Sequence, residues 1–130
     1  MRLTYGKVKT FRRDGRKMPW QTNSKEILAK ENDSYEFSLK KEWRELLGNA
    51  PAVPVNFITD NDITGGNSGS PVVNARGELI GLAFDGNKES LASDVSFTPN
   101  YNRCVCVDIR FVLWTLENYA HLDRIVSELQ

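Results

Sequence analysis

Three glycines surround one serine in the stretch Asp62-Ile63-Thr64-Gly65-Gly66-Asn67-Ser68-Gly69-Ser70-Pro71. Glycines leave the backbone amides of a loop unshielded, and two such amides can stabilise the oxyanion of an acyl-transfer intermediate, where one lost donor costs on the order of 3 kcal/mol. The stretch therefore suggests Ser68 as a nucleophile, with the amides of Gly66 and Ser68 as oxyanion donors. On composition alone, an ordinary Gly/Ser turn explains the same residues more simply.

Short strands are expected on both sides of this loop. Between residues 53 and 107, apolar segments and turns alternate at close spacing, which favours a small antiparallel barrel or sandwich over a parallel sheet. Residues 74–77 suit a hairpin turn. Residues 12–20 are rich in turn-forming and basic residues and are expected to form a solvated loop. The expected strands are residues 2–11, 53–58, 71–73, 79–84, 95–97 and 104–107.

Helices are expected before and after this strand-rich region. A short helix begins at Asn23, where Glu26 completes a capping box. A second helix is capped by Ser38 and ended by Gly48, with apolar residues on one face. A C-terminal helix is capped by Asp108 and is continued or restarted near Leu122.

Composition limits the classes of function. The chain has 130 residues and no net charge, with 17 basic and 17 acidic side chains. This length suits one domain with its own core, and a neutral chain lacks the basic excess that favours nucleic acids or anionic membranes. No apolar run reaches the roughly 18 residues of a membrane span, and no signal peptide is expected after Met1. Cys104 and Cys106 are expected in the core, with no metal site and no cofactor.

The order of residues in the serine loop resembles the nucleophile loop of chymotrypsin-fold serine peptidases, whose usual motif is Gly-Asp-Ser-Gly-Gly-Pro. The similarity continues through residues 72–74 and 77–81. Asn67 stands where many members have Asp, and Ser70 stands where they have Gly. Both differences also resemble the glutamyl endopeptidase branch, so an endopeptidase of that type stays open as an alternative.

Four segments in order resemble the bacterial dipeptidyl-peptidase 7 and 11 family, which removes dipeptides from free N-termini in the periplasm or at the cell surface. The resemblance implies that residues 1–130 are a single, mainly β domain. It would be the second, C-terminal antiparallel barrel of a trypsin-like serine peptidase, six-stranded, with short helices and a C-terminal α-helix. The segments are Arg2-Leu3-Thr4-Tyr5-Gly6-Lys7-Val8-Lys9, residues 61–71, residues 77–87 and Val107-Asp108-Ile109-Arg110-Phe111-Val112-Leu113-Trp114.

The resemblance also implies roles for individual residues. Ser68 becomes the nucleophile and Gly66 supplies an oxyanion amide. Asp85, with the backbone of Phe84 beside it, helps to hold the free amino group of the substrate, as an ammonium in a partly desolvated pocket requires an anion. Gly86 occupies the position that sets the first specificity pocket. Arg there would select acidic side chains, whereas Gly leaves an open, neutral pocket for hydrophobic or uncharged residues. A plain Asp-Gly turn is the alternative.

A catalytic base is not evident near the serine. Ser68 needs an adjacent histidine, and in chymotrypsin-type chains His and Asp precede Ser. The only histidine, His121, follows Ser68 by 53 residues and is expected at a helix end or on the surface. The N-terminal barrel and helical domain of the family are absent from this chain, so we expect a C-terminal portion that is inactive alone.

Two kinds of partner follow from this interpretation. The expected partners are peptides with a free N-terminus and the missing N-terminal barrel, whose absence would expose apolar surface and favour self-association, for instance as a homodimer. The remaining alternative is a non-catalytic fragment that binds a peptide or a partner barrel.

Overall fold

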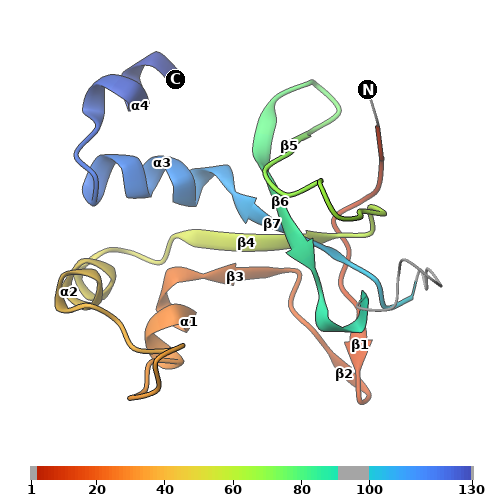
Figure 1. Cartoon of the computed structure of the whole chain (residues 1–130), viewed down its shortest axis with the longest axis horizontal. Helices are drawn as coiled ribbons and strands as arrows, with labels where there is room; N and C mark the ends of the chain where they lie inside the picture. Colours follow the sequence, from red (N-terminus) through yellow and green to blue (C-terminus); the bar gives the residue numbers. More distant parts are fainter. Residues whose placement is uncertain (1–2, 91–99, 130) are drawn as a thin grey trace.

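The computed structural model describes residues 3–90 and 100–129 (Figure 1). Its centre is an antiparallel sheet of five strands in the order β3–β4–β7–β6–β5. A separate hairpin pairs β1 with β2. The bounds are β1 Arg12–Arg13, β2 Arg16–Lys17, β3 Gln21–Asn23, β4 Pro54–Thr59, β5 Pro71–Val73, β6 Leu79–Gly86 and β7 Cys104–Asp108.

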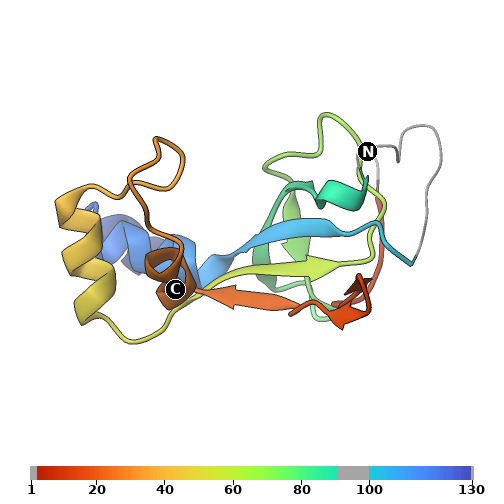
Figure 2. The same ribbon diagram turned by 90° about the horizontal axis from the view of Figure 1, so that it is seen from below.

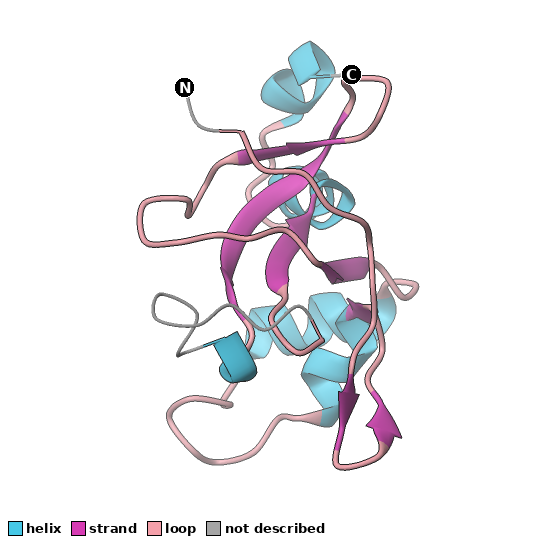
Figure 3. Ribbon diagram, turned by 90° about the vertical axis from the view of Figure 1, so that its right-hand side faces the viewer, coloured by secondary structure: helices cyan, strands magenta, loops and turns pink. Residues whose placement is uncertain are grey.

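The predicted fold class, mainly antiparallel β with short helices and a C-terminal helix, is confirmed, although details differ. In the described residues the main sheet has five strands, not the six of the expected barrel. Within residues 3–11, the described part of the expected strand at 2–11, the pairing is reduced to one bridge between Val8 and Thr59. The expected strand at 95–97 lies outside the described residues. Figure 3 shows that the strands curve rather than lie flat.

The core forms because alternate residues of two adjacent inner strands, β4 and β7, point inward. Both β4 and β7 alternate between buried and half-buried positions, and their pairing places Phe57 opposite Cys106. Phe57, Ala83, Cys104 and Cys106 form one buried cluster. The cysteines are free thiols, as predicted for core residues. Hydrogen bonding to Cys104 and burial raise the pKa of the Cys106 thiol.

In residues 3–90 and 100–129, four α-helices accompany the sheet: α1 Ser24–Ala29, α2 Lys41–Asn49, α3 Ile109–Asn118 and α4 Asp123–Leu129. The capping box of Asn23 and Glu26 is present, and Asp108 caps α3 by accepting the amide of Arg110 at 3.0 Å. The C-terminal segment is restarted as α4 rather than continued. None of the helices in the described ranges is long and apolar enough to cross a membrane.

Two predictions about local structure are wrong. Ser38 does not cap α2, which begins three residues later at Lys41 after the N-cap Lys40, and Gly48 lies inside the helix instead of ending it. Residues 12–17 are not an irregular loop but the β1–β2 hairpin. Its turn residues Asp14 and Gly15 have φ values of 49° and 76°, the left-handed conformation that tight hairpins require.

Helices and loops occupy opposite ends of the sheet. All four helices gather at one end, and the β1–β2 hairpin lies at the other (Figures 1 and 2). Aromatic stacking holds α2 against the end of α3, because the Trp43 ring lies 4.4 Å from that of Tyr119 and 6.5 Å from that of Trp114. The end away from the helices is therefore left to the loops that form the candidate site.

Gly81 provides a test of the sheet packing. A β-carbon there would collide with the Val107 carbonyl oxygen and lie 2.7 Å from the Phe57 ring. Because backbone and core ring cannot both move away, Gly81→Ala is expected to lower the free energy of unfolding by about 2 kcal/mol or more in urea titrations.

Gly48 is the matched control. It lies in α2 with open space around it, so Gly48→Ala is expected to raise the free energy of unfolding by about 0.5–1 kcal/mol. Equal stability of the two variants would contradict the packing at Gly81.

Candidate active site

The serine loop between β4 and β5 is closed by Asn67. Its side-chain oxygen accepts the Thr64 amide at 3.0 Å, its own amide donates to the Thr64 carbonyl at 3.2 Å, and its carbonyl accepts the Ser70 amide at 2.9 Å. Gly66 and Gly69 have φ values of 95° and 84°, which favour glycine. Asn67 therefore fixes the turn that carries Ser68.

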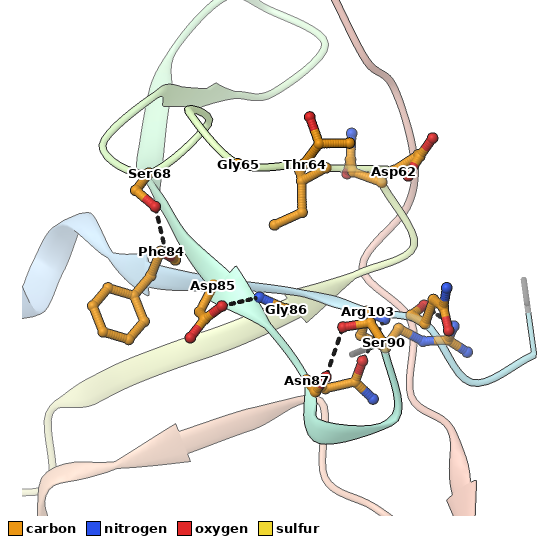
Figure 4. Close-up of a pocket in the computed structure, with 13 residues that line it drawn as sticks. Asp62, Thr64, Gly65, Ser68, Phe84, Asp85, Gly86, Asn87, Ser90 and Arg103 are labelled. Atoms are coloured by element: carbon orange, nitrogen blue, oxygen red, sulfur yellow. Dashed lines mark hydrogen bonds between the residues drawn. The ribbon is translucent and has the colours of Figure 1, made fainter. Parts of the chain in front are cut away.

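The same loop is attached to β6. The Gly69 amide donates to the Ala83 carbonyl at 2.7 Å, and the Ala83 amide donates to the Ser70 carbonyl at 2.9 Å. Directly after Ala83, β6 shifts register against β7, which leaves Phe84 as a bulge residue. The hydroxyl of Ser68 donates to the Phe84 carbonyl at 3.1 Å (Figure 4). The bulge thus lies beside the predicted nucleophile.

The backbone around Ser68 is open to solvent. Both Gly66 and Ser68 are exposed, and among the hydrogen bonds of residues 3–90 and 100–129 none uses the amide of either residue. Two neighbouring amides near a serine hydroxyl are the donors that an oxyanion requires.

One pocket of about 230 Å³ lies next to Ser68. It brings together four predicted site residues, namely Ser68, Phe84, Asp85 and Gly86. Gly66 is not in the lining, although its neighbour Gly65 is. The Asp85 carboxylate is exposed and accepts the Gly86 amide at 2.7 Å (Figure 4). The remaining lining comes from residues 61–64, Asn87, Ser90, Asn102 and Arg103.

Arg103 is a structural residue of this pocket that the sequence analysis missed. It is only 2% exposed, and within the described part of the chain its guanidinium donates to the backbone carbonyls of Lys9, Thr10, Asn100 and Asn102. Burial lowers its pKa. In the sequence, the role of Arg103 was indicated only by its position directly before the apolar strand β7. Arg103 thus binds the N-terminal segment, defined as residues 3–11, to the pocket wall.

Asp60 fastens the same segment from the other side. Its carboxylate accepts the Lys7 amide at 2.7 Å and lies 3.4 Å from the Lys9 ammonium. The Lys7 hydrogen bond, with further help from Lys9, lowers the pKa of Asp60. Gly6 crosses so closely that a β-carbon there would lie 2.8 Å from the Asn61 amide. The N-terminal segment therefore braces residues 60–61, where the pocket wall begins.

The turn between α3 and α4, which carries His121, lies at the helical end of the sheet, away from the loop between β4 and β5 (Figure 1). His121 is exposed, with φ of 54°. This confirms its prediction as a surface residue at a helix end. The hydroxyl of Ser68 is bonded to the Phe84 carbonyl rather than to an imidazole.

Comparison with known proteins gives consistent matches. A family model described as peptidase S46 matches residues 1–130. Dipeptidyl-peptidase 7 of Capnocytophaga gingivalis is 43% identical over 143 residues, and the match covers 99% of this chain and 20% of that protein. An Asp/Glu-specific dipeptidyl-peptidase of Porphyromonas endodontalis is 37% identical, with 100% and 20% covered.

A solved structure matches as well. The crystal structure of Porphyromonas endodontalis DPP11 in complex with the dipeptide Arg-Asp has a TM-score of 0.91 at 36% identity, covering 98% of this chain and 20% of that chain. The chain thus spans about a fifth of the length of the curated relatives that it matches.

The brace at Asp60 predicts an acid dependence of stability. Because the folded-state pKa of Asp60 lies below its unfolded value of about 3.9, its stabilisation is present above that pH and is lost as pH falls through the folded pKa. Asp60→Asn should therefore lower stability at neutral pH and flatten its decline below about pH 4. Urea midpoints measured across this range test it, and an unchanged acid slope would contradict the brace.

Proposed function

Because the chain belongs to the peptidase S46 family, we propose that it is the C-terminal catalytic portion of a serine peptidase that removes dipeptides from free peptide N-termini. The observation that carries the proposal is one pocket that joins Ser68, next to two unused amides, with the carboxylate of Asp85. This combination offers a nucleophile, an oxyanion site and an anion for a substrate amine. The proposal also includes the periplasmic or cell-surface location that the resemblance to this family implies.

In the proposed reaction, the Ser68 oxygen attacks the scissile carbonyl while a base removes the hydroxyl proton. The amides of Gly66 and Ser68 receive the developing negative charge. The base then returns the proton to the leaving amine, and water releases the dipeptide from the acyl-enzyme. His121 is not at Ser68, so the base and its carboxylate partner come from the N-terminal barrel of the same protein.

Asp85 restricts the reaction to chain ends. One oxygen of its carboxylate accepts the Gly86 amide, and the other can bind the terminal ammonium of a substrate. A charge-assisted contact of this kind fixes the register of the peptide relative to Ser68. Cleavage after the second residue then follows from the fixed distance between Asp85 and Ser68.

Gly86 determines the residue accepted before the cleaved bond, the P1 residue. Relatives with general and with Asp/Glu-specific names both match this chain, so overall similarity does not select between them. Position 86 carries neither charge nor side chain here. We therefore propose hydrophobic or uncharged P1 residues.

The serine mechanism is tested first in the full-length protein. Ser68→Ala should reduce dipeptide release from free-amine peptides by at least about 10³-fold while the fold is kept. A fluorophosphonate should label Ser68 of the full-length protein, whereas the 130-residue chain should stay unlabelled because it lacks the base. Stoichiometric labelling of the isolated chain would contradict the proposal that the base lies outside these 130 residues. Unchanged dipeptide release by the Ser68→Ala variant would exclude Ser68 as the nucleophile.

The amine anchor is tested with Asp85→Asn. Loss of the carboxylate should lower kcat/KM for free-amine peptides by about 10- to 100-fold, mainly through KM. Asp14→Asn, which removes the same charge from the exposed β1–β2 turn, is the control and should leave kcat/KM unchanged.

N-terminally acetylated peptides separate the alternatives. The wild-type enzyme should not cleave them, because a blocked amine cannot bind Asp85. Efficient cleavage would indicate an endopeptidase of the glutamyl type, and cleavage of neither peptide would indicate a non-catalytic binding protein.

A further inference from the structure

The space beside Gly86 is not empty. A β-carbon built at this glycine would collide with the hydroxyl oxygen of Ser90 and lie 3.4 Å from its β-carbon. Both residues line the pocket next to Ser68 (Figure 4). The pocket is therefore less open at Gly86 than the sequence suggests, because the volume that glycine vacates is occupied by the side chain of Ser90.

The Ser90 side chain is held in this position. Its hydroxyl donates to the Asn87 carbonyl at 2.6 Å, and its amide donates to the same carbonyl at 2.8 Å. These two bonds close the 3₁₀ turn Lys88–Ser90. A hydroxyl that donates a hydrogen bond to a backbone carbonyl has little freedom to rotate out of the pocket.

Asn87 in turn is bound to the segment before β7. Its side-chain oxygen accepts the Arg103 amide at 2.8 Å, its side-chain nitrogen donates to the Tyr101 carbonyl at 2.8 Å, and its amide donates to the Arg103 carbonyl at 2.9 Å. The turn that carries Ser90 is thus fixed to the sheet on both sides, since Gly86 itself pairs with Cys104.

We infer that Ser90 is a second determinant of P1 specificity, which sets the depth of the pocket beside Gly86. This inference rests on the proposed dipeptidyl-peptidase function. With Gly86 and Ser90 together, the pocket accepts uncharged P1 side chains of small to medium size, and the Ser90 side chain limits access for large aromatic ones. The identity of residue 86 alone does not describe the pocket, because residues 86 and 90 compete for one volume.

The test uses the full-length protein and dipeptide substrates that share the first residue and carry Ala, Leu or Phe at P1. One methylene in an apolar pocket changes kcat/KM by roughly 10- to 200-fold. Ser90→Gly should therefore raise the Phe/Ala ratio of kcat/KM by about 10-fold or more. Lys88→Ala, in the same turn but exposed and outside the pocket, is the control and should leave the ratio unchanged.

A double-mutant cycle tests the shared volume directly. Gly86→Ala alone should lower kcat/KM for all three substrates, because the new methyl group meets the Ser90 hydroxyl. In the double variant, the added Ser90→Gly should recover most of the kcat/KM that Gly86→Ala loses. The effects of the two substitutions are then not additive. This cycle stays informative even if Ser90→Gly loosens the turn. A loosened turn would lower kcat/KM of the double variant further instead of restoring it.

The outcomes are distinguishable. An active wild-type enzyme with an unchanged Phe/Ala ratio in Ser90→Gly and additive effects in the cycle would overturn the role of Ser90 alone. Absence of any dipeptide release by the wild-type enzyme would overturn the proposed function, and this inference with it.

Discussion

The attachment of the serine loop to β6 is the interaction on which the candidate site depends. Two backbone hydrogen bonds, from Gly69 to Ala83 and from Ala83 to Ser70, align the loop with the strand. The register shift that follows at Phe84 turns its carbonyl toward Ser68. One strand therefore carries the partner of the nucleophile, the candidate amine anchor and the candidate specificity residue in consecutive positions, and their spacing is set by backbone geometry rather than by flexible side chains.

The pocket wall is assembled from segments far apart in the chain. Arg103 binds carbonyls of residues 9 and 10, and Asp60 binds the amide of Lys7. A buried guanidinium is costly unless its donors are satisfied, and here the carbonyls of irregular segments accept them. The N-terminal segment, whose described residues 3–11 add one bridge to the sheet, is in this way a support for the site rather than a strand of the barrel.

The sequence predicted local structure correctly where one side chain determines it. It predicted local structure wrongly where other contacts compete for the same residues. The capping box at Asn23 and the cap at Asp108 were predictable because a side chain satisfies amides two or three residues away. Ser38 has the same capping chemistry, but its hydroxyl donates to the Tyr35 carbonyl and its amide to the Ser34 carbonyl, so Ser38 belongs to the preceding turn and α2 begins after it. Residues 12–17 were expected as a loop because most of them are charged and lack the apolar alternation of a strand. The positive φ values of Asp14 and Gly15, which form the hairpin turn, are seen only in the structure.

The sequence by itself determined the chemistry: a glycine-rich loop around Ser68, a carboxylate at Asp85, a residue without a side chain at Gly86 and the absence of a neighbouring histidine. These follow from residue types in a fixed order, because such properties do not depend on distant contacts. Only the tertiary structure decided how the pocket is bounded. Ser90, Asn87 and Arg103 carry no distinctive local signal, and they reach the site because β6 and β7 pair with Gly86 opposite Cys104. The shape of a pocket depends on segments that meet only after folding, so a sequence pattern predicts the nucleophile more readily than the space its substrate must fit.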